Sequence, residues 1–115
     1  MPQITGTPFE EYVWNGVWLR RFSPSQGWNS DRQKRLAGRY CIDFTAYQGN
    51  LRVVGDAKDK ARITYGDVEK LIEDAGIYKA SRLLLVVAGD TAFPDGVWNY
   101  ADRNDVEIVR TRWRG

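Results

Sequence analysis

Apolar residues recur at helical spacing soon after the N-terminus. Thr7 offers an N-cap hydroxyl, Pro8 suits the first helical position, and the two glutamates that follow Phe9 favour the positive end of a helix dipole. The pattern predicts an amphipathic helix from Pro8 to about Phe22, with one stripe packed inward. The apolar positions of this helix are Phe9, Tyr12, Val13, Val17 and Leu19.

The next segment, "SPSQGWNSDRQKRLAGR", carries Pro24, Gly27 and Gly38 among polar residues. We therefore predict a long loop, with a short helical turn near residues 31–36. Loops of this length in small domains are usually functional or mobile. Trp28 lies in this polar segment and is the tryptophan that we expect to be exposed.

The rest of the chain alternates strand and helix patterns. The stretches "RYCIDFTAY" and "LRVVGDAK" flank "QGN" and predict a β-hairpin over residues 39–59. Residues 64–80 predict an amphipathic helix capped by Thr64, and the continuous apolar run at 82–89 predicts a strand buried on both faces. A short helix over 94–104 and a strand over 106–113 follow. This order predicts an α/β sandwich with a mixed central sheet that contains an antiparallel hairpin.

Length and composition fit one soluble domain over residues 1–115, with 43% hydrophobic and 28% charged residues. No apolar run approaches the ~20 residues of a membrane helix. The start "MPQITGTPFEE" lacks the regions of a signal peptide, so we expect a cytoplasmic protein without membrane partners. The absence of His excludes Cys/His zinc sites and imidazole triads, and the lone Cys41 forms no internal disulfide.

The net charge of +2 is unevenly distributed. Six basic residues stand against one acidic residue between Arg20 and Arg39, and the ending "RTRWRG" adds three arginines. Such clusters can neutralise phosphates, with Trp28 and Trp113 against sugars or bases, but they also suit a solvated face that keeps a small protein soluble. The candidate nucleic-acid contacts are Arg20, Arg21, Trp28, Arg32, Lys34, Arg35, Arg39 and Lys60.

Charged residues mark the end of the predicted hairpin. In its second strand, Asp56 and Lys58 point the same way, with Cα atoms ~7 Å apart. In its first strand, Asp43 lies within the apolar "CIDF", where a carboxylate is costly unless a cation, a metal or several donors offset its charge. Counted from the turn, Asp43 and Asp56 are cross-strand or diagonal neighbours within ~8 Å. Two such carboxylates can hold Mg²⁺, and Lys58 can orient the attacking water or bind the scissile phosphate.

Each of these residues also has a purely structural explanation. Asp56 and Lys58 suit the solvated end of a hairpin. Asp43 can accept hydrogen bonds from a nearby arginine such as Arg39. Glu10 suits a first helical turn because of the helix dipole. These alternatives remain open at the level of sequence.

Asp43, twelve intervening residues and then Asp56-Ala57-Lys58 together resemble the signature of the PD-(D/E)xK phosphodiesterase superfamily. The fold of that superfamily is the restriction endonuclease-like three-layer α/β/α sandwich. It runs helix, three-stranded antiparallel meander or hairpin, helix and further strands, which is similar to the order expected here for nearly the whole chain. Mrr-like catalytic domains look closest, because they open with a Phe-Glu pair, here Phe9-Glu10, and end with an apolar strand, a short helix and a last strand.

The resemblance implies Mg²⁺-dependent hydrolysis of nucleic-acid phosphodiester bonds, with Mn²⁺ as a substitute. Two departures stand out: Ile42 replaces the proline of the motif, and Asp56 stands where many Mrr-like members have Gln or Glu. Lys60 shares the face of Lys58 if the strand continues, so either lysine suits the role beside the attacking water. The catalytic residues that the resemblance implies are Glu10, Asp43, Asp56 and Lys58, with Asp43 and Asp56 as the metal ligands.

We therefore expect a small endonuclease with DNA as the favoured substrate and RNA or tRNA as the alternative, in restriction, repair, junction resolution or as a toxin domain. The alternative is a catalytically inactive nucleic-acid-binding or protein-interaction module of the same fold, in which Asp56 and Lys58 merely pair. A homodimer, a protein inhibitor or a partner subunit is also compatible with the basic segment. A domain this small leaves little room for separate base recognition, so we expect weak sequence specificity or a partner subunit.

Overall fold

The structure, a computed structural model, describes residues 7–36 and 40–113. Its five strands form one sheet in the order β1-β2-β3-β4-β5. The pairs β1–β2 and β2–β3 are antiparallel, whereas the pairs β3–β4 and β4–β5 are parallel. The strands are β1 (Asn29–Leu36), β2 (Tyr40–Gln48), β3 (Leu51–Lys58), β4 (Arg82–Ala88) and β5 (Val106–Thr111); the α-helices are α1 (Pro8–Val13), α2 (Leu19–Arg21), α3 (Tyr65–Tyr78) and α4 (Asp95–Arg103).

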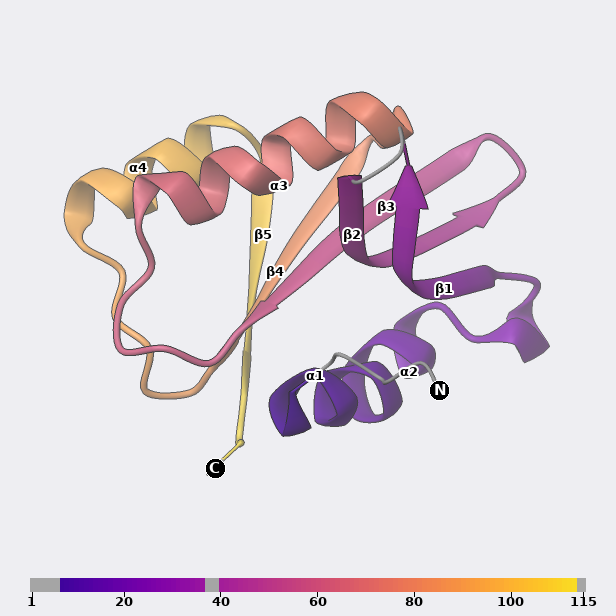
Figure 1. Cartoon of the computed structure of the whole chain (residues 1–115), viewed down its shortest axis with the longest axis horizontal. Coiled ribbons are helices and arrows are strands. Elements are labelled where there is room, and N and C mark those ends of the chain that lie inside the picture. The colour runs from indigo at the N-terminus through magenta and orange to yellow at the C-terminus, as the bar shows by residue number, and fades with distance from the viewer. Residues whose placement is uncertain (1–6, 37–39, 114–115) are drawn as a thin grey trace.

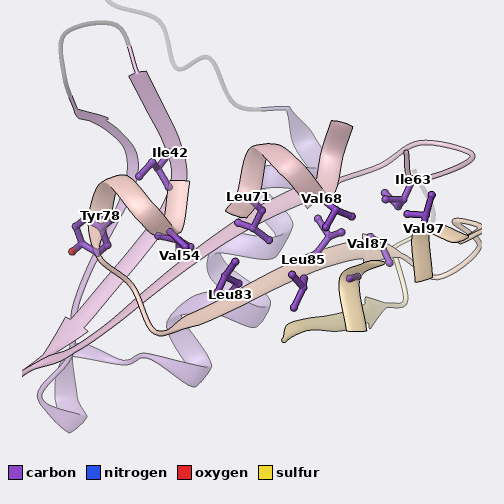
Figure 2. Close-up of a cluster of buried hydrophobic side chains, with 13 residues drawn as sticks. Ile42, Val54, Ile63, Val68, Leu71, Tyr78, Leu83, Leu85, Val87 and Val97 are labelled. Carbon is purple, nitrogen blue, oxygen red and sulfur yellow. The ribbon is translucent and has the colours of Figure 1, made fainter. Parts of the chain in front are cut away.

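Helices cover both faces of the sheet and create three layers. Helices α3 and α4 lie on one side, and α1 with α2 lies on the other (Figure 1). On the α3 side, Leu71 packs into a cluster with Val54 and Leu85 (Figure 2). On the α1 side, Trp18 belongs to a second cluster with Leu84. Successive residues of β4 therefore enter opposite cores, which explains its continuous apolar run, and the expected α/β/α sandwich is confirmed.

The polar segment after the first helix is a strand and not the expected long loop. The prediction of a helical turn near residues 31–36 is wrong, because Asn29–Leu36 forms β1 and pairs with β2 from Asn29 opposite Tyr47 onward. Backbone hydrogen bonds hold this edge strand although most of its side chains are polar. Before this strand, residues 24–26 of the same segment form a 3₁₀ turn. Trp28 is half-buried and lies edge-on against Phe22, with ring centroids 4.8 Å apart.

A π-helical turn, Trp14–Trp18, separates α1 from α2 within the predicted first helix. In an uninterrupted α-helix, Val17 would follow Val13 on the inward stripe. The π turn instead directs Trp18 inward, where its Nε1 donates a hydrogen bond to the carbonyl of Thr45 at 3.2 Å. Val17 and Leu19 are only half-buried. The buried residues of this segment are Phe9, Val13, Trp18 and Phe22.

The other predicted elements are present with small changes at their ends. The hairpin turns at Gly49, whose positive φ of 61° suits glycine. Helix α3 begins with a capping box in which Thr64 and Asp67 bond each other's backbone N–H groups. Within residues 7–36 and 40–113, no helix is long and apolar enough to cross a membrane.

Candidate active site

The candidate site lies where β2 separates from β3. The pairing of these strands runs from the turn to Phe44 opposite Gly55 and ends there. Asp43 and Asp56 occupy the next position on each strand, so they would face each other if the register continued. The carboxyl group of Asp56 is close enough to that of Asp43 to raise its pKa. Two acidic side chains from neighbouring strands therefore meet at the point where the hairpin opens.

Asp56 is fixed by contacts from its own strand. The residue is only 4% exposed, and its Oδ1 accepts a hydrogen bond from the backbone N–H of Ala57 at 3.0 Å. Its Oδ2 lies 3.4 Å from Nζ of Lys58. Burial lowers the pKa of Lys58, but the negative charges of Asp56 and Asp67 outweigh it and raise that pKa above its usual value. Lys58 is therefore a stable cation beside the carboxylates.

Asp43 is a carboxyl group in an electrostatically costly position. Burial raises its pKa, and the hydrogen bond to Asp56 together with the negative charges of Asp56 and Glu10 raises it further, to about 9. Lys58 opposes this effect only in part. Two carboxyl groups in contact cannot both ionise without a compensating charge, so the pair holds a proton at neutral pH. A divalent cation would supply the compensating charge in place of that proton.

Glu10 adds a third carboxylate, which comes from α1 in the helical layer beside the sheet. Burial raises the pKa of Glu10, and the charge of Asp56 contributes in the same direction. Its Oε1 accepts a weak hydrogen bond from Nε2 of Gln33 at 3.4 Å, and Oε1 of Gln33 accepts one from Sγ of Cys41 at 3.5 Å. Gln33 is a residue of β1 with a left-handed φ of 54°. Its side chain thus connects α1 to β2. No pattern in the sequence distinguishes this glutamine from the other polar residues of its segment.

The acidic group fits a hard divalent cation. No three Asp, Glu or Cys side chains among residues 7–36 and 40–113 already stand at the spacing of a metal site. Mg²⁺, however, is usually bound through only one or two carboxylates and keeps several of its waters. Asp43 and Asp56 form such a pair, and Glu10 is close enough for its charge to act on Asp43. The donor set is all oxygen, which is the ligand type that Mg²⁺ prefers.

The two candidate lysines occupy different environments. Lys58 is the last residue of β3 and contacts Asp56. Lys60 lies beyond the strand, and its Nζ binds Oδ2 of Asp67 in α3 at 2.8 Å. The strand does not continue far enough to bring Lys60 to the face of Lys58. The lysine that the structure brings to the acidic pair is Lys58.

Lys70 of α3 contacts β2 close to the site. Nζ of Lys70 donates a hydrogen bond to the carbonyl of Cys41 at 3.2 Å and forms an ion pair with Asp74 at 3.0 Å. The side chain of Asp74 is 1% exposed, and burial raises its pKa. Because Cys41 is two residues from Asp43, this contact helps to set the path of β2 after it leaves β3. Sequence alone did not indicate it, because no pattern relates position 70 to position 41.

The basic residues expected to contact nucleic acid are spread over several elements. Arg32 of β1 forms a 2.9 Å ion pair with Glu11 of α1 and so joins the two elements. Lys34 pairs with Asp31 of its own strand at 3.6 Å. Arg39 lies outside the described residues, as does any contact between it and Asp43. The remaining arginines of this group are exposed, namely Arg20, Arg21 and Arg35.

A cleft lies near the acidic group, and no sequence pattern predicted it. It has a volume of about 810 Å³ and lies past the C-terminal ends of β3, β4 and β5, where Asp59, Asp90 and Trp113 line it. Asp59 follows Lys58 directly in the chain. The sequence marked Trp113 as a candidate contact to sugars or bases within a basic tail, but not its place at this cleft. Its position beside the first helix is a tertiary contact that no local pattern encodes.

No protein-family profile matches the sequence, and the search among curated proteins finds no match. Solved structures do match. A repair endonuclease from Pyrococcus abyssi has a TM-score of 0.64 and 15% identity, over 96% of this chain and 49% of that one. A complex of EndoMS with dsDNA has a TM-score of 0.66 and 17% identity, over 100% of this chain and 48% of that one. SfsA from Pyrococcus furiosus, in complex with Ca²⁺, has a TM-score of 0.56 and 13% identity, over 88% and 55%.

The chain has the restriction endonuclease-like fold. The expected restriction endonuclease-like fold is thereby confirmed, whereas the roles of Asp43, Asp56 and Lys58 stay predictions. At identities of 13% to 17%, the likeness concerns the fold alone. The chain spans about half the length of these three structures.

Proposed function

We propose that this protein is a metal-dependent endonuclease that hydrolyses phosphodiester bonds in nucleic acid, with DNA as the favoured substrate. The observation that carries the proposal is the meeting of Asp43 and Asp56, with Lys58 3.4 Å from the second carboxylate, at the open end of the hairpin. Burying two carboxyl groups together lowers the stability of the fold, and such groups with perturbed pKa values are concentrated at functional sites.

Each residue of the group has a distinct role in this proposal. Asp43 and Asp56 hold Mg²⁺ or Mn²⁺, and Glu10 contributes further negative charge from α1. The bound ion supplies positive charge beside the phosphate and acidifies water. Lys58 remains protonated next to Asp56, so its ammonium group can orient the attacking water or bind a phosphate oxygen. The protein thus positions the nucleophile and the phosphate and compensates the charge that develops.

The fold neighbours support the choice of nucleic acid. Two of them are described as a repair endonuclease and as EndoMS bound to double-stranded DNA. The third neighbour is described in complex with Ca²⁺, another hard cation that takes oxygen ligands. The chain spans only about half of each neighbour. A domain this small has little room for base recognition, so we expect sequence specificity to depend on a partner.

A second candidate function is a binding module without catalysis. The contact between Asp56 and Lys58 favours it, because each charge is already partly compensated by the other. The two functions differ in their response to metal. Mg²⁺ or Mn²⁺ raises the melting temperature of the nuclease, since it binds only the folded protein, and the shift is absent in Asp43→Asn. A binding module melts at the same temperature with and without metal.

The decisive experiment is a cleavage assay with plasmid, single-stranded DNA and tRNA in Mg²⁺ or Mn²⁺. We expect Asp56→Asn and Lys58→Met to reduce the rate by at least about 100-fold, because each removes a charge at the reacting phosphate. Lys60→Met is the matched control and should retain the rate, since Lys60 binds Asp67 instead. Equal cutting by the wild type and by the Asp56 and Lys58 variants would refute the proposed site.

A further inference from the structure

Two features connect the cleft past the ends of β3, β4 and β5 to the candidate active site. Its wall residue Asp59 directly follows Lys58, so the cleft begins where the catalytic strand ends. Its other wall, Trp113, packs against Phe9, the residue that precedes Glu10, with ring centroids 5.7 Å apart. The segment that follows Lys58 therefore lines the cleft, and the helical turn that carries Glu10 packs against Trp113 in the cleft wall.

Trp113 forms a fixed aromatic wall of this cleft. Its ring lies 5.7 Å from that of Phe9 and 5.3 Å from that of Tyr12. Its Nε1 donates a hydrogen bond to Oδ2 of Asp59 at 3.1 Å. Two ring contacts and one hydrogen bond hold the indole in place while part of it still lines the open cleft. A preorganised indole loses little conformational entropy when a flat ligand stacks on it.

The polar groups of the cleft complement a nucleotide rather than a bare anion. Asp59 and Asp90 offer carboxylate oxygens that accept hydrogen bonds from base N–H groups, and the exposed Arg112 offers a cation to a phosphate. Gly89 allows the backbones of the cleft wall to approach closely, because a Cβ there would lie 2.7 Å from the carbonyl oxygen of Thr111. The volume of about 810 Å³ lies within the range of ≈ 300–1,000 Å³ typical of small-molecule sites, so one nucleotide fits with room for its neighbours in the strand.

We infer that this cleft binds the nucleotide next to the scissile phosphate of a single-stranded or locally unpaired nucleic acid, with its base stacked on Trp113 and its phosphate near Arg112. The inference rests on the proposed nuclease function, and it assigns a binding subsite beside that function's catalytic group. Stacking on an aromatic side chain works for every base, so the subsite confers a preference for unpaired strand and not for sequence. A fully paired duplex cannot offer a base to Trp113 without unstacking it.

The test measures binding separately from cleavage. A short fluorescein-labelled single-stranded oligodeoxynucleotide is titrated by anisotropy against protein that carries Asp56→Asn, which prevents cutting. We expect Trp113→Leu to weaken binding about tenfold, because leucine keeps apolar packing but offers no ring to a base. Trp113→Phe should bind within about threefold of the parent, since phenylalanine retains a stacking face. Both variants lose the hydrogen bond to Asp59, so that loss cannot explain a difference between them.

Trp98→Leu is the matched control, because Trp98 is a 46% exposed tryptophan on α4 that does not line the cleft. Its affinity should equal that of the parent. If Trp113→Leu does not fold, Arg112→Ala replaces it: the side chain is exposed, and its removal should weaken binding and lower the salt dependence of the affinity. Unchanged affinity in Trp113→Leu, or in Arg112→Ala where it is the variant used, overturns the subsite.

Failure of the subsite and failure of the nuclease proposal give different results. A protein that cuts DNA in Mg²⁺ but binds the oligonucleotide equally well with Trp113→Leu keeps its nuclease function and loses the subsite. A protein that cuts nothing, yet binds the oligonucleotide through Trp113, keeps the subsite and loses the nuclease function. Equal affinity for a blunt duplex and for single strand in the Asp56→Asn protein also contradicts the subsite.

Discussion

Asp43 illustrates how far a single residue can be understood from sequence. A carboxylate between Ile42 and Phe44 contradicts the surrounding apolar pattern, and counting from the turn relates it to Asp56 on the next strand. The structure brings the two carboxyl groups into contact. The position of Glu10 beside them followed only from the family resemblance, because the packing of a helix against a strand far along the chain leaves no local signal. The same reason explains why the sequence did not predict the cleft beside Trp113.

Gly55 is the residue through which the first helix approaches the catalytic strand. A Cβ at this position would lie 2.3 Å from Cζ3 and 2.8 Å from Cη2 of Trp18, which is fully buried and has no room to move. We expect Gly55→Ala to destabilise the fold by about 1–3 kcal/mol through overpacking. Because Asp56 is the next residue, the resulting shift of the strand should also reduce cleavage. Chemical denaturation and the cleavage assay measure the two effects.

Gly16→Ala is the matched control for that substitution. Gly16 lies in the π-helical turn, and a Cβ there would meet nothing within 4 Å. Replacing a helical glycine by alanine should stabilise the protein by about 0.5–1 kcal/mol, because the unfolded chain loses freedom. Opposite signs for Gly55→Ala and Gly16→Ala support the proposed close approach of Trp18. Two stabilising substitutions would show that the sheet accommodates a methyl group at position 55.

At the scale of elements, the hairpin, helices α3 and α4, and strands β4 and β5 follow from periodicity and turn residues. Strand β1 does not, because "NSDRQKRL" contains a single apolar residue and a strand is recognised by alternation. An edge strand can form by backbone pairing alone when its neighbour supplies the other half of the ladder. The π turn at Trp14–Trp18 was missed for another reason: it depends on where two large tryptophans find space against the sheet.

Asp67 connects the end of the catalytic hairpin to the start of α3. Its Oδ2 accepts hydrogen bonds from the backbone N–H of Thr64 at 2.9 Å and from Nζ of Lys60 at 2.8 Å. Burial alone would raise the pKa of Asp67, but these hydrogen bonds lower it below its usual value. A carboxyl group with a lowered folded-state pKa stabilises the fold above its unfolded pKa of ≈ 3.9, and this contribution is lost as the pH falls through the folded-state pKa.

We expect Asp67→Ala to lower the free energy of unfolding by about 1 kcal/mol near neutral pH, because it removes an N-terminal capping box. The difference from the wild type should shrink as the pH falls below about 4, where the wild-type carboxyl group takes up a proton. Urea denaturation at several pH values measures it. Asp67→Asn retains a side-chain oxygen for the backbone N–H of Thr64 but loses the charge facing Lys60. Its free energy of unfolding should therefore lie between those of the wild type and of Asp67→Ala. A difference that does not change with pH would contradict the role of the charge.

The sheet consists of a parallel half, β3 to β5, and an antiparallel half, β1 to β3. Strand β4 is paired on both sides, and residues 83–88 are buried between the two helical layers. Strand β1 is paired on one side only, and Gln33 adopts a positive φ within it. The acidic group lies at the junction, where β2 leaves β3. Functional sites are often placed at such boundaries, because one side supplies fixed ligands and the other can adjust to a substrate.

This division predicts the order of amide hydrogen exchange across the sheet. The N–H groups of β4 should exchange only through global unfolding, whereas those of β1 should exchange through local opening of the edge, roughly 100-fold faster. Exchange followed by mass spectrometry or NMR measures both strands in one experiment, and β3 serves as an internal reference because it pairs with β4 as well as with β2. Equal protection of β1 and β4 would mean that the sheet opens as one unit. The adjustable side of the site would then have to be sought in the helices and not in the antiparallel half.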